Sequence, residues 1–484
     1  MNRIINLKFI SKILSKNLLI IALALLSCTI IAFIYAEPLS PFILSFLIAL
    51  ATSLLFFIFS GSGGENTQLH RKDAYFTVTF SWILMTLIGS MPYLLSGAIP
   101  FFTNAFFESV SGFTTTGSSI LTDIEALPKS ILFWRSLTHW IGGIGIIVLV
   151  ILIMPTLQIG GYHLFTMESS LQEKIHPKIK SVGIRLLAIY FLLTVAETLL
   201  LLAGKMNLFE SVCHAFGTVA TGGFSPKNTS IANYSPFIQY VVMIFMLLSG
   251  ANFVVHYYLL KKEFSKIKEN EELKLYLGVI LFVGLIITSV LFLKTERPIE
   301  EAFREAFFQV ISVITCTGFA SADYLLWPQY AWIIIFFIMF LGGSTGSTAG
   351  GIKMARHLVL IKNIRKNFRQ LLYPNAILHL RINKKPINDE TNNSILTFIS
   401  VYFIVFIVGS FLIMATGVTD IPTAASAVAT CMAGIGPGIG TVGPASNFAH
   451  LPELSKLILS FLMIVGRLEI YTVLLLFTKK FWTE

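Results

Sequence analysis

The chain contains 484 residues, of which 55% are hydrophobic and only 12% are charged, and its formal net charge is +10. Soluble domains carry about 25% charged residues, so this composition argues against a soluble enzyme or binding module. Apolar runs, each long enough to cross about 30 Å of hydrocarbon as a helix, lie near residues 17–36, 40–59, 74–97, 131–155, 184–203, 236–260, 275–293, 394–416 and 456–478. We therefore predict an all-α polytopic membrane protein.

The lysine and arginine residues predict how the chain is oriented in the membrane. Most of these 35 residues fall in six clusters, at residues 3–16, 71–72, 174–185, 261–274, 353–385 and 479–480. Cytoplasmic loops carry an excess of basic residues, so the distribution places both termini in the cytoplasm. Topology beside anionic lipid accounts for the net positive charge, and nucleic acid is not expected as a partner.

In chain order, an N-terminal transmembrane hairpin at residues 1–72 is followed by four similar units. The units occupy residues 73–180, 181–272, 273–391 and 392–484. Each reads as a long helix, a short half-apolar helix, a glycine turn and a second long helix. Similarity between successive segments of a chain is the sequence signature of a repeat architecture. We predict four helix–pore-helix–helix repeats with pseudo-fourfold symmetry around one pore.

Three of the short helices carry recognisable start signals. Asn207 opens the second, Pro298 is expected in the first turn of the third, and Asp420 is expected to cap the fourth with Pro422 just inside it. Asparagine and aspartate are favoured N-caps, and proline is favoured at the first helical position.

Each short helix ends in small residues and a glycine. A helix that stops halfway through the membrane leaves its last carbonyls unpaired and carries partial negative charge at that end. Glycine permits backbone angles that turn carbonyls toward an axis, and a ring of carbonyls can replace the water shell of a potassium ion. The predicted K⁺ selectivity filter comprises Thr115, Thr116, Gly117, Thr221, Gly222, Gly223, Cys316, Thr317, Gly318, Gly434, Ile435 and Gly436.

Two points of this assignment leave alternatives. In the second unit either Gly222 or Gly223 could be the key glycine, and we choose Gly223 because Gly-Phe recurs at Gly318. In the fourth unit Gly434, Gly436 and Gly438 compete, and we choose Gly436. Glycines that only pack ordinary helices are the other interpretation, which four copies at matching places disfavour.

The sequence resembles the Trk/Ktr/HKT superfamily of potassium transporters, and within it the bacterial TrkH family. The resemblance covers almost the whole chain, including the hairpin and the motifs that end at Gly117, Ser225 and Gly351. It implies a potassium-conducting subunit of the bacterial inner membrane, a homodimer with one pore per protomer, and a cytoplasmic TrkA-like partner ring that binds nucleotide. No covalent cofactor is implied. Gly434-Ile435 departs most from the other copies.

A break interrupts the second long helix of the third unit. Ten residues rich in glycine, serine and threonine cannot form a lipid-facing helix, but they can form a mobile loop beside an aqueous path. We predict that this loop gates the pore, with a passive packing kink as the alternative. The predicted gate comprises Gly342, Gly343, Ser344, Thr345, Gly346, Ser347, Thr348, Ala349, Gly350 and Gly351. Residues 373–392 are expected to form a polar linker.

Arg467 is expected near the middle of the last apolar run. An arginine at membrane depth is costly and marks a functional site by default, so we predict a cationic barrier beneath the filter and count Arg467 with the gate. The alternative is a buried ion pair with another helix. Glu108 and Glu197 are also intramembrane or interfacial acids, without a predicted role.

Three functions compete: a gated potassium pore, an alternating-access transporter coupled to protons or sodium, and a membrane-embedded enzyme. Alternating-access folds use inverted repeats, whereas every unit here begins and ends on the same side, which favours the pore. The Gly142-Gly143-Ile-Gly145 stretch is not preceded by a strand, so it indicates helix packing rather than nucleotide binding. An enzyme is not expected because no HExxH motif, Gly-x-Ser-x-Gly motif or pair of catalytic carboxylates supports one.

Overall fold

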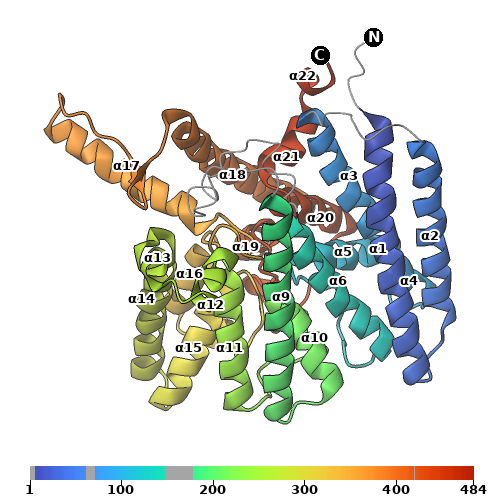
Figure 1. Ribbon diagram of the computed structural model, residues 1–484. Coiled ribbons are helices and arrows are strands. Elements are labelled where there is room, and N and C mark those ends of the chain that lie inside the picture. The colour runs from blue at the N-terminus through green and yellow to red at the C-terminus, as the bar shows by residue number, and fades with distance from the viewer. Residues whose placement is uncertain (1–5, 62–70, 149–177, 419, 484) are drawn as a thin grey trace.

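The computed structural model describes residues 6–61, 71–148, 178–418 and 420–483. Helices make up nearly all of the regular structure (Figure 1). The N-terminal hairpin consists of α1 (Leu7–Ile34) and α2 (Ser40–Ser60). The second agrees with the predicted run 40–59, whereas α1 begins ten residues before the predicted run 17–36. The hairpin stands at one side of the molecule, where α1 packs against α3 and α6.

The four predicted units follow as successive groups of helices. The first contains α3 (Arg71–Gly89), α4 (Met91–Leu95), α5 (Phe102–Phe113) and α6 (Lys129–Val148). The second contains α9 (Lys178–Ala203), α10 (Leu208–Val219), α11 (Pro236–Gly250), α12 (Phe253–Leu260) and α13 (Phe264–Glu269). The short helices α5 and α10 are the ones that precede the glycine turns.

The third group contains α14 (Glu271–Lys294), α15 (Ile299–Ile314), η2 (Tyr324–Leu326), α16 (Gln329–Ile338) and α17 (Met354–Leu372). The fourth contains α18 (Asp389–Ala415), α19 (Ile421–Ala433), η3 (Gly440–Val442), α20 (Glu453–Arg467), α21 (Ile470–Leu474), η4 (Leu475–Phe477) and α22 (Lys479–Trp482). The expected linker between them holds a small antiparallel hairpin of β1 (Arg381–Ile382) and β2 (Lys385–Pro386). Here α15 and α19 are the short helices.

The start signals of the short helices act largely as predicted. The side chain of Asn207 accepts a hydrogen bond from the backbone N–H of Glu210, and that of Asp420 accepts one from Thr423. Pro422 lies in the first turn of α19. Pro298 is the residue before the first turn of α15, one position earlier than predicted.

The prediction of one continuous helix is wrong for two of the apolar runs, because each run is sharply bent. In the described residues, six helices are long and apolar enough to cross a membrane, or eight if each bent pair counts as one span. The run 236–260 turns by 103° between α11 and α12, and the run 456–478 turns by 117° between α20 and α21. Asn252 causes the first bend by capping α12, because its side chain accepts the backbone N–H of Val254. The run 131–155 continues beyond the described residues.

Polar and apolar side chains are distributed as a lipid-facing surface requires. Large apolar side chains are exposed along α1, α2, α14 and α18, whereas threonines and serines at the ends of the short helices are buried. The glycines of α6 pack closely, as predicted. A β-carbon at Gly142 would lie 2.1 Å from the Phe113 carbonyl oxygen, and one at Gly143 would lie 3.0 Å from Cα of Ala220. They bring α6 against the ends of α5 and α10.

Candidate functional site

The four glycine turns have the same backbone conformation. In each turn two residues, separated by one other, adopt left-handed φ angles. The glycines Gly117, Gly223, Gly318 and Gly436 hold the second of these positions, with φ of 83°, 80°, 80° and 97°. Residues with side chains rarely adopt such angles. The fourth turn repeats the pattern at Gly434 and Gly436, so these residues are structurally equivalent to the other three turns despite the different sequence.

The first left-handed position explains the unusual residue of the fourth turn. Thr115, Thr221 and Cys316 hold this position with φ of 51°, 54° and 55°, whereas Gly434 holds it with φ of 72°. Left-handed backbone costs a residue with a β-carbon roughly 1–2 kcal/mol. Three of the turns therefore store strain that the fourth does not. Gly434 departs from the other copies in sequence while keeping their conformation.

Each short helix closes with the same hydrogen bond. The backbone N–H between the two left-handed residues bonds to the carbonyl five residues earlier, which is the Schellman pattern at a helix end. These bonds join Thr116 to Ser111 at 2.9 Å, Gly222 to Gly217 at 2.7 Å, Thr317 to Ser312 at 2.8 Å and Ile435 to Thr430 at 3.0 Å. The N–H groups are thus used within their own helix, and the carbonyls that follow remain for other partners.

The four turns meet in a closed ring. In each turn, the glycine at the second left-handed position faces the carbonyl group of the middle residue of the next turn. A β-carbon added to that glycine would collide with the carbonyl oxygen. The distances to that oxygen would be 2.2 Å from Gly117 to Gly222, 2.0 Å from Gly223 to Thr317, 1.7 Å from Gly318 to Ile435 and 2.9 Å from Gly436 to Thr116. The structure thus brings all twelve predicted filter residues together, and glycine is required at these four positions by space as well as by φ.

A buried ion pair lies next to the ring and contacts the chain that follows the second turn. Arg135 donates from Nε to Oε1 of Glu108 at 2.8 Å, and both side chains are almost fully buried. The same guanidinium donates to the Ser225 carbonyl at 3.2 Å and lies 3.9 Å from the ring centre of Phe224. Breaking such a pair typically destabilises a protein by about 3–5 kcal/mol. This role could not be predicted, because nothing in the sequence relates residue 135 to residue 108.

Two histidines without predicted metal-ligand roles also support the second turn. The ring of His139 stacks on Phe224 at 4.1 Å between centroids. Nε2 of His214 lies 2.9 Å from the Ser225 hydroxyl, and its Nδ1 lies 2.8 Å from the Glu210 carbonyl oxygen. His214 in α10 and Glu108 in α5 each tie a short helix to the extended chain that follows its turn.

The predicted gate, residues 342–351, lies against the ends of the short helices. The Thr348 hydroxyl donates to the Val219 carbonyl of α10 at 3.0 Å. A β-carbon at Gly350 would lie 2.1 Å from the Ala433 carbonyl oxygen of α19, and one at Gly351 would lie 3.4 Å from Sγ of Cys316. Most of the segment is buried, and none of it is helical. It therefore lies directly next to three of the four turns.

Arg467 reaches the same segment. Its Nη1 donates to the Thr348 carbonyl at 2.7 Å, and the side chain is buried. Arg467 is the last residue of α20 rather than a mid-helix residue, because the chain bends at Glu469 with φ of 65°. Glu469 pairs with Arg356 instead. Among the described residues Nε and Nη2 of Arg467 have no hydrogen-bond partner, and no acidic side chain there pairs with it.

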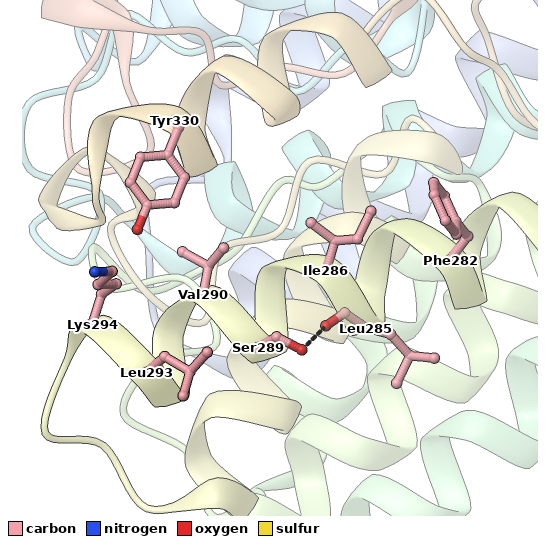
Figure 2. Close-up of a pocket in the computed structure, with 8 residues that line it drawn as sticks. All are labelled: Phe282, Leu285, Ile286, Ser289, Val290, Leu293, Lys294 and Tyr330. Atoms are coloured by element: carbon pink, nitrogen blue, oxygen red, sulfur yellow. Dashed lines mark hydrogen bonds between the residues drawn. The ribbon is translucent and has the colours of Figure 1, made fainter.

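A groove of about 480 Å³ lies elsewhere, between α14 and α16. Figure 2 shows Phe282, Ile286 and Val290 along one helix, with Lys294 and Tyr330 at one end. None of its lining residues belongs to the ring or to residues 342–351. In the described residues, no group of three or more His, Cys, Asp or Glu side chains is placed to hold a metal ion. The ring of backbone groups is therefore the candidate site.

Four helix ends, with their partial negative charge, around a ring of backbone carbonyls define a membrane protein of the cation-transport class. The comparisons agree with this class. The family model described as "TrkH: Cation transport protein" matches residues 42–483. The chain belongs to the TrkH family.

Individual relatives extend over nearly the full chain. The Trk system potassium uptake protein TrkH of Salmonella typhimurium is 37% identical over 427 residues, covering 87% of this chain and 88% of that protein. The protein of the same name from Halomonas elongata is 34% identical over 487 residues, covering 99% of this chain and 100% of that protein. The crystal structure of the potassium transporter TrkH from Vibrio parahaemolyticus matches with a TM-score of 0.90 and 29% identity, covering 98% of this chain and 99% of that one.

Proposed function

We propose that this protein takes up potassium ions through the ring of four turns, which acts as the selectivity filter. The observation that carries the proposal is the closed cycle in which each turn presses a left-handed glycine against the next turn's carbonyl. Backbone carbonyls at a fixed spacing are suited to replacing the hydration shell of K⁺. The filter residues are those predicted, 115–117, 221–223, 316–318 and 434–436. The potassium uptake named for the relatives supports the choice of ion.

The same proposal assigns residues 342–351 and Arg467 to the gate. The segment's contacts with the ends of α10 and α19 support a position in the ion path beneath the filter. Arg467 adds a positive charge, two of whose nitrogens have no hydrogen-bond partner among the described residues. A cation passing this point would meet both the gate segment, which blocks the path, and a repulsive positive charge. Conduction then requires the segment to move.

The membrane that holds the protein and the partners that it binds belong to the same proposal. The protein is a multi-pass component of the bacterial inner membrane with both termini in the cytoplasm, as the distribution of lysine and arginine favours. It assembles as a homodimer and binds a cytoplasmic TrkA-like ring that carries the regulatory nucleotide, while this chain itself holds only K⁺. The relatives' description as parts of a Trk system supports a multi-component assembly.

Recording from the purified chain in planar bilayers tests this function. A pore gives unitary potassium currents, which exceed what an alternating-access carrier can pass through one molecule. Because the gate is closed without a partner in this proposal, the recording should include a variant lacking Thr345 to Ser347 alongside the intact chain. Potassium flux without any unitary event, in both proteins, would contradict the pore and favour a coupled carrier.

A further inference from the structure

Glu272 is a buried acid whose surroundings point to a specific role. It lies in the first turn of α14, has no exposed surface, and forms no salt bridge among the described residues. Its Oε1 accepts two backbone N–H groups, from Thr345 at 2.7 Å and from Ala355 at 2.9 Å. One oxygen therefore joins the gate segment to the helix that follows it. Oε2 is buried without a hydrogen-bond partner.

The hydrogen bond from the Ala355 N–H to Glu272 satisfies a donor at the start of α17. The first N–H groups of a helix have no partner within the helix, and an N-cap side chain usually accepts one of them. Lys353 holds the N-cap position of α17, but it makes no capping bond, because an ammonium group can only donate. Glu272 supplies the missing acceptor from a different helix. The negative charge also suits the positive end of α17.

The hydrogen bond from Thr345 and the one from Arg467 hold the same segment from two different helices. Arg467 holds the carbonyl of Thr348 from α20, while Glu272 holds the N–H of Thr345 from α14. The gate segment is thus held by side chains of α14 and α20 at positions three residues apart. Two backbone hydrogen bonds add to this, from the Ser344 N–H to the Gly250 carbonyl and from the Phe253 N–H to the Gly346 carbonyl, but only side chains can be removed by mutation.

We propose that Glu272 is a positioning residue that latches the gate segment in its closed position. Loss of the two hydrogen bonds to Oε1 would free the Thr345 N–H and remove the cap of α17 at the same time. The segment and the helix would then move together. The inference rests on the proposed function of residues 342–351 as a gate. It does not require Glu272 to touch the permeating ion.

Two measurements on the purified full chain test the latch. The first is basal potassium flux into vesicles without any partner. The second is the rate at which a water-soluble thiol reagent modifies Thr345→Cys, a site whose hydroxyl has no hydrogen-bond partner. The four native cysteines are all buried. Modification of a buried site reports the population of locally open molecules, so this rate follows the segment itself and not the ion.

Glu272→Ala should raise both the modification rate and the flux by at least tenfold, which corresponds to about 1.4 kcal/mol in the closed–open equilibrium. Glu272→Gln keeps an acceptor oxygen at the same reach and should stay near the wild type. Glu272→Asp keeps the charge but is one methylene shorter, and it should resemble alanine. Should the alanine protein fail to fold, the Asp–Gln pair decides: equal rates in these two would overturn the latch.

Glu271→Ala is the matched control. The neighbouring Glu271 bonds to Lys362 of α17 and to the N–H of Asn383, and among the described residues it forms no hydrogen bond with the gate segment. Its loss should leave both measurements unchanged, and an increase equal to that of Glu272→Ala would overturn the role of the Glu272 oxygen. A lower melting temperature for Glu272→Ala, with neither rate altered, would reduce Glu272 to an ordinary cap.

The two measurements also separate this inference from the proposed gate. Faster modification without faster flux would support the latch and remove the segment from the ion path. Raised flux after deletion of Thr345 to Ser347, with no effect of Glu272→Ala on either rate, would support the gate and overturn the latch.

Discussion

Replacing Gly223 by serine tests the ring most directly. The added β-carbon would lie 2.0 Å from the Thr317 carbonyl oxygen and 3.1 Å from the Thr317 carbonyl carbon. To reach even a 3.0 Å contact, the oxygen must move by about 1 Å, and it belongs to backbone rather than to a flexible side chain. The φ of 80° adds roughly 1–2 kcal/mol of strain. The displaced oxygen is one of the proposed potassium ligands.

The expected result is a loss of discrimination between potassium and sodium of at least tenfold, or an equal fall in potassium flux. A tenfold change needs only about 1.4 kcal/mol, which the strain and the displacement together exceed. Competing uptake of the two ions into vesicles measures it, with the folded fraction checked by size-exclusion chromatography. Gly278→Ser is the matched control, because that helical glycine has nothing within 4 Å of an added β-carbon.

The fourth turn provides a comparison within the ring. A β-carbon at Gly434 meets only the Thr115 carbonyl oxygen at 3.9 Å, and the other turns carry threonine or cysteine there. Gly434→Thr should therefore lose much less selectivity than Gly436→Ala, whose β-carbon would lie 2.9 Å from the Thr116 oxygen. Unchanged uptake of both ions by Gly223→Ser would refute the reasoning, as would equal losses at Gly434 and Gly436.

Three further predictions concern the surroundings of the ring. Arg467→Ala should raise potassium flux in vesicles while Arg467→Lys should not, since repulsion at about 4 Å amounts to roughly 1–4 kcal/mol; stable alanine protein with unaltered flux would contradict a barrier. Deleting Thr345 to Ser347 should raise basal flux without a partner, and wild-type flux in folded, inserted protein would make the segment a packing kink. Glu108→Ala should leave Arg135 buried and unpaired and lower the free energy of unfolding by about 3–5 kcal/mol, and denaturation in detergent that shows less than about 1 kcal/mol would argue against a structural ion pair.

The repeat was predictable because its signals are local. Asn207 and Asp420 cap the short helices from the position just before the first turn, and a glycine with left-handed φ stands where each turn ends. These features need only a few neighbouring residues. The class of the fold followed from hydropathy, which depends on composition along each run.

The bends were missed although their signals are local, whereas the supporting contacts were not predictable because they depend on distant residues. Hydropathy averages over a window, so it joined α11 to α12 and α20 to α21 across their bends. The small residues before Asn252 were the signal for the first bend, and the charge at Glu469 was the signal for the second. Glu272 had the pattern of an ordinary first-turn acid, and only the fold shows that it reaches Thr345 and Ala355.

The closure of the ring has a consequence for biosynthesis. The first turn is bound to the last, since the Ser118 hydroxyl donates to the Gly436 carbonyl across 318 residues of sequence, and Phe448 bonds to Ser119 beside it. Membrane chains are made from the N-terminus, and contacts of such separation form late. The nascent chain therefore cannot complete an ion path until its fourth unit is inserted. A chain that stalls before residue 436 lacks the end of the fourth turn, so the proposed selectivity filter stays incomplete.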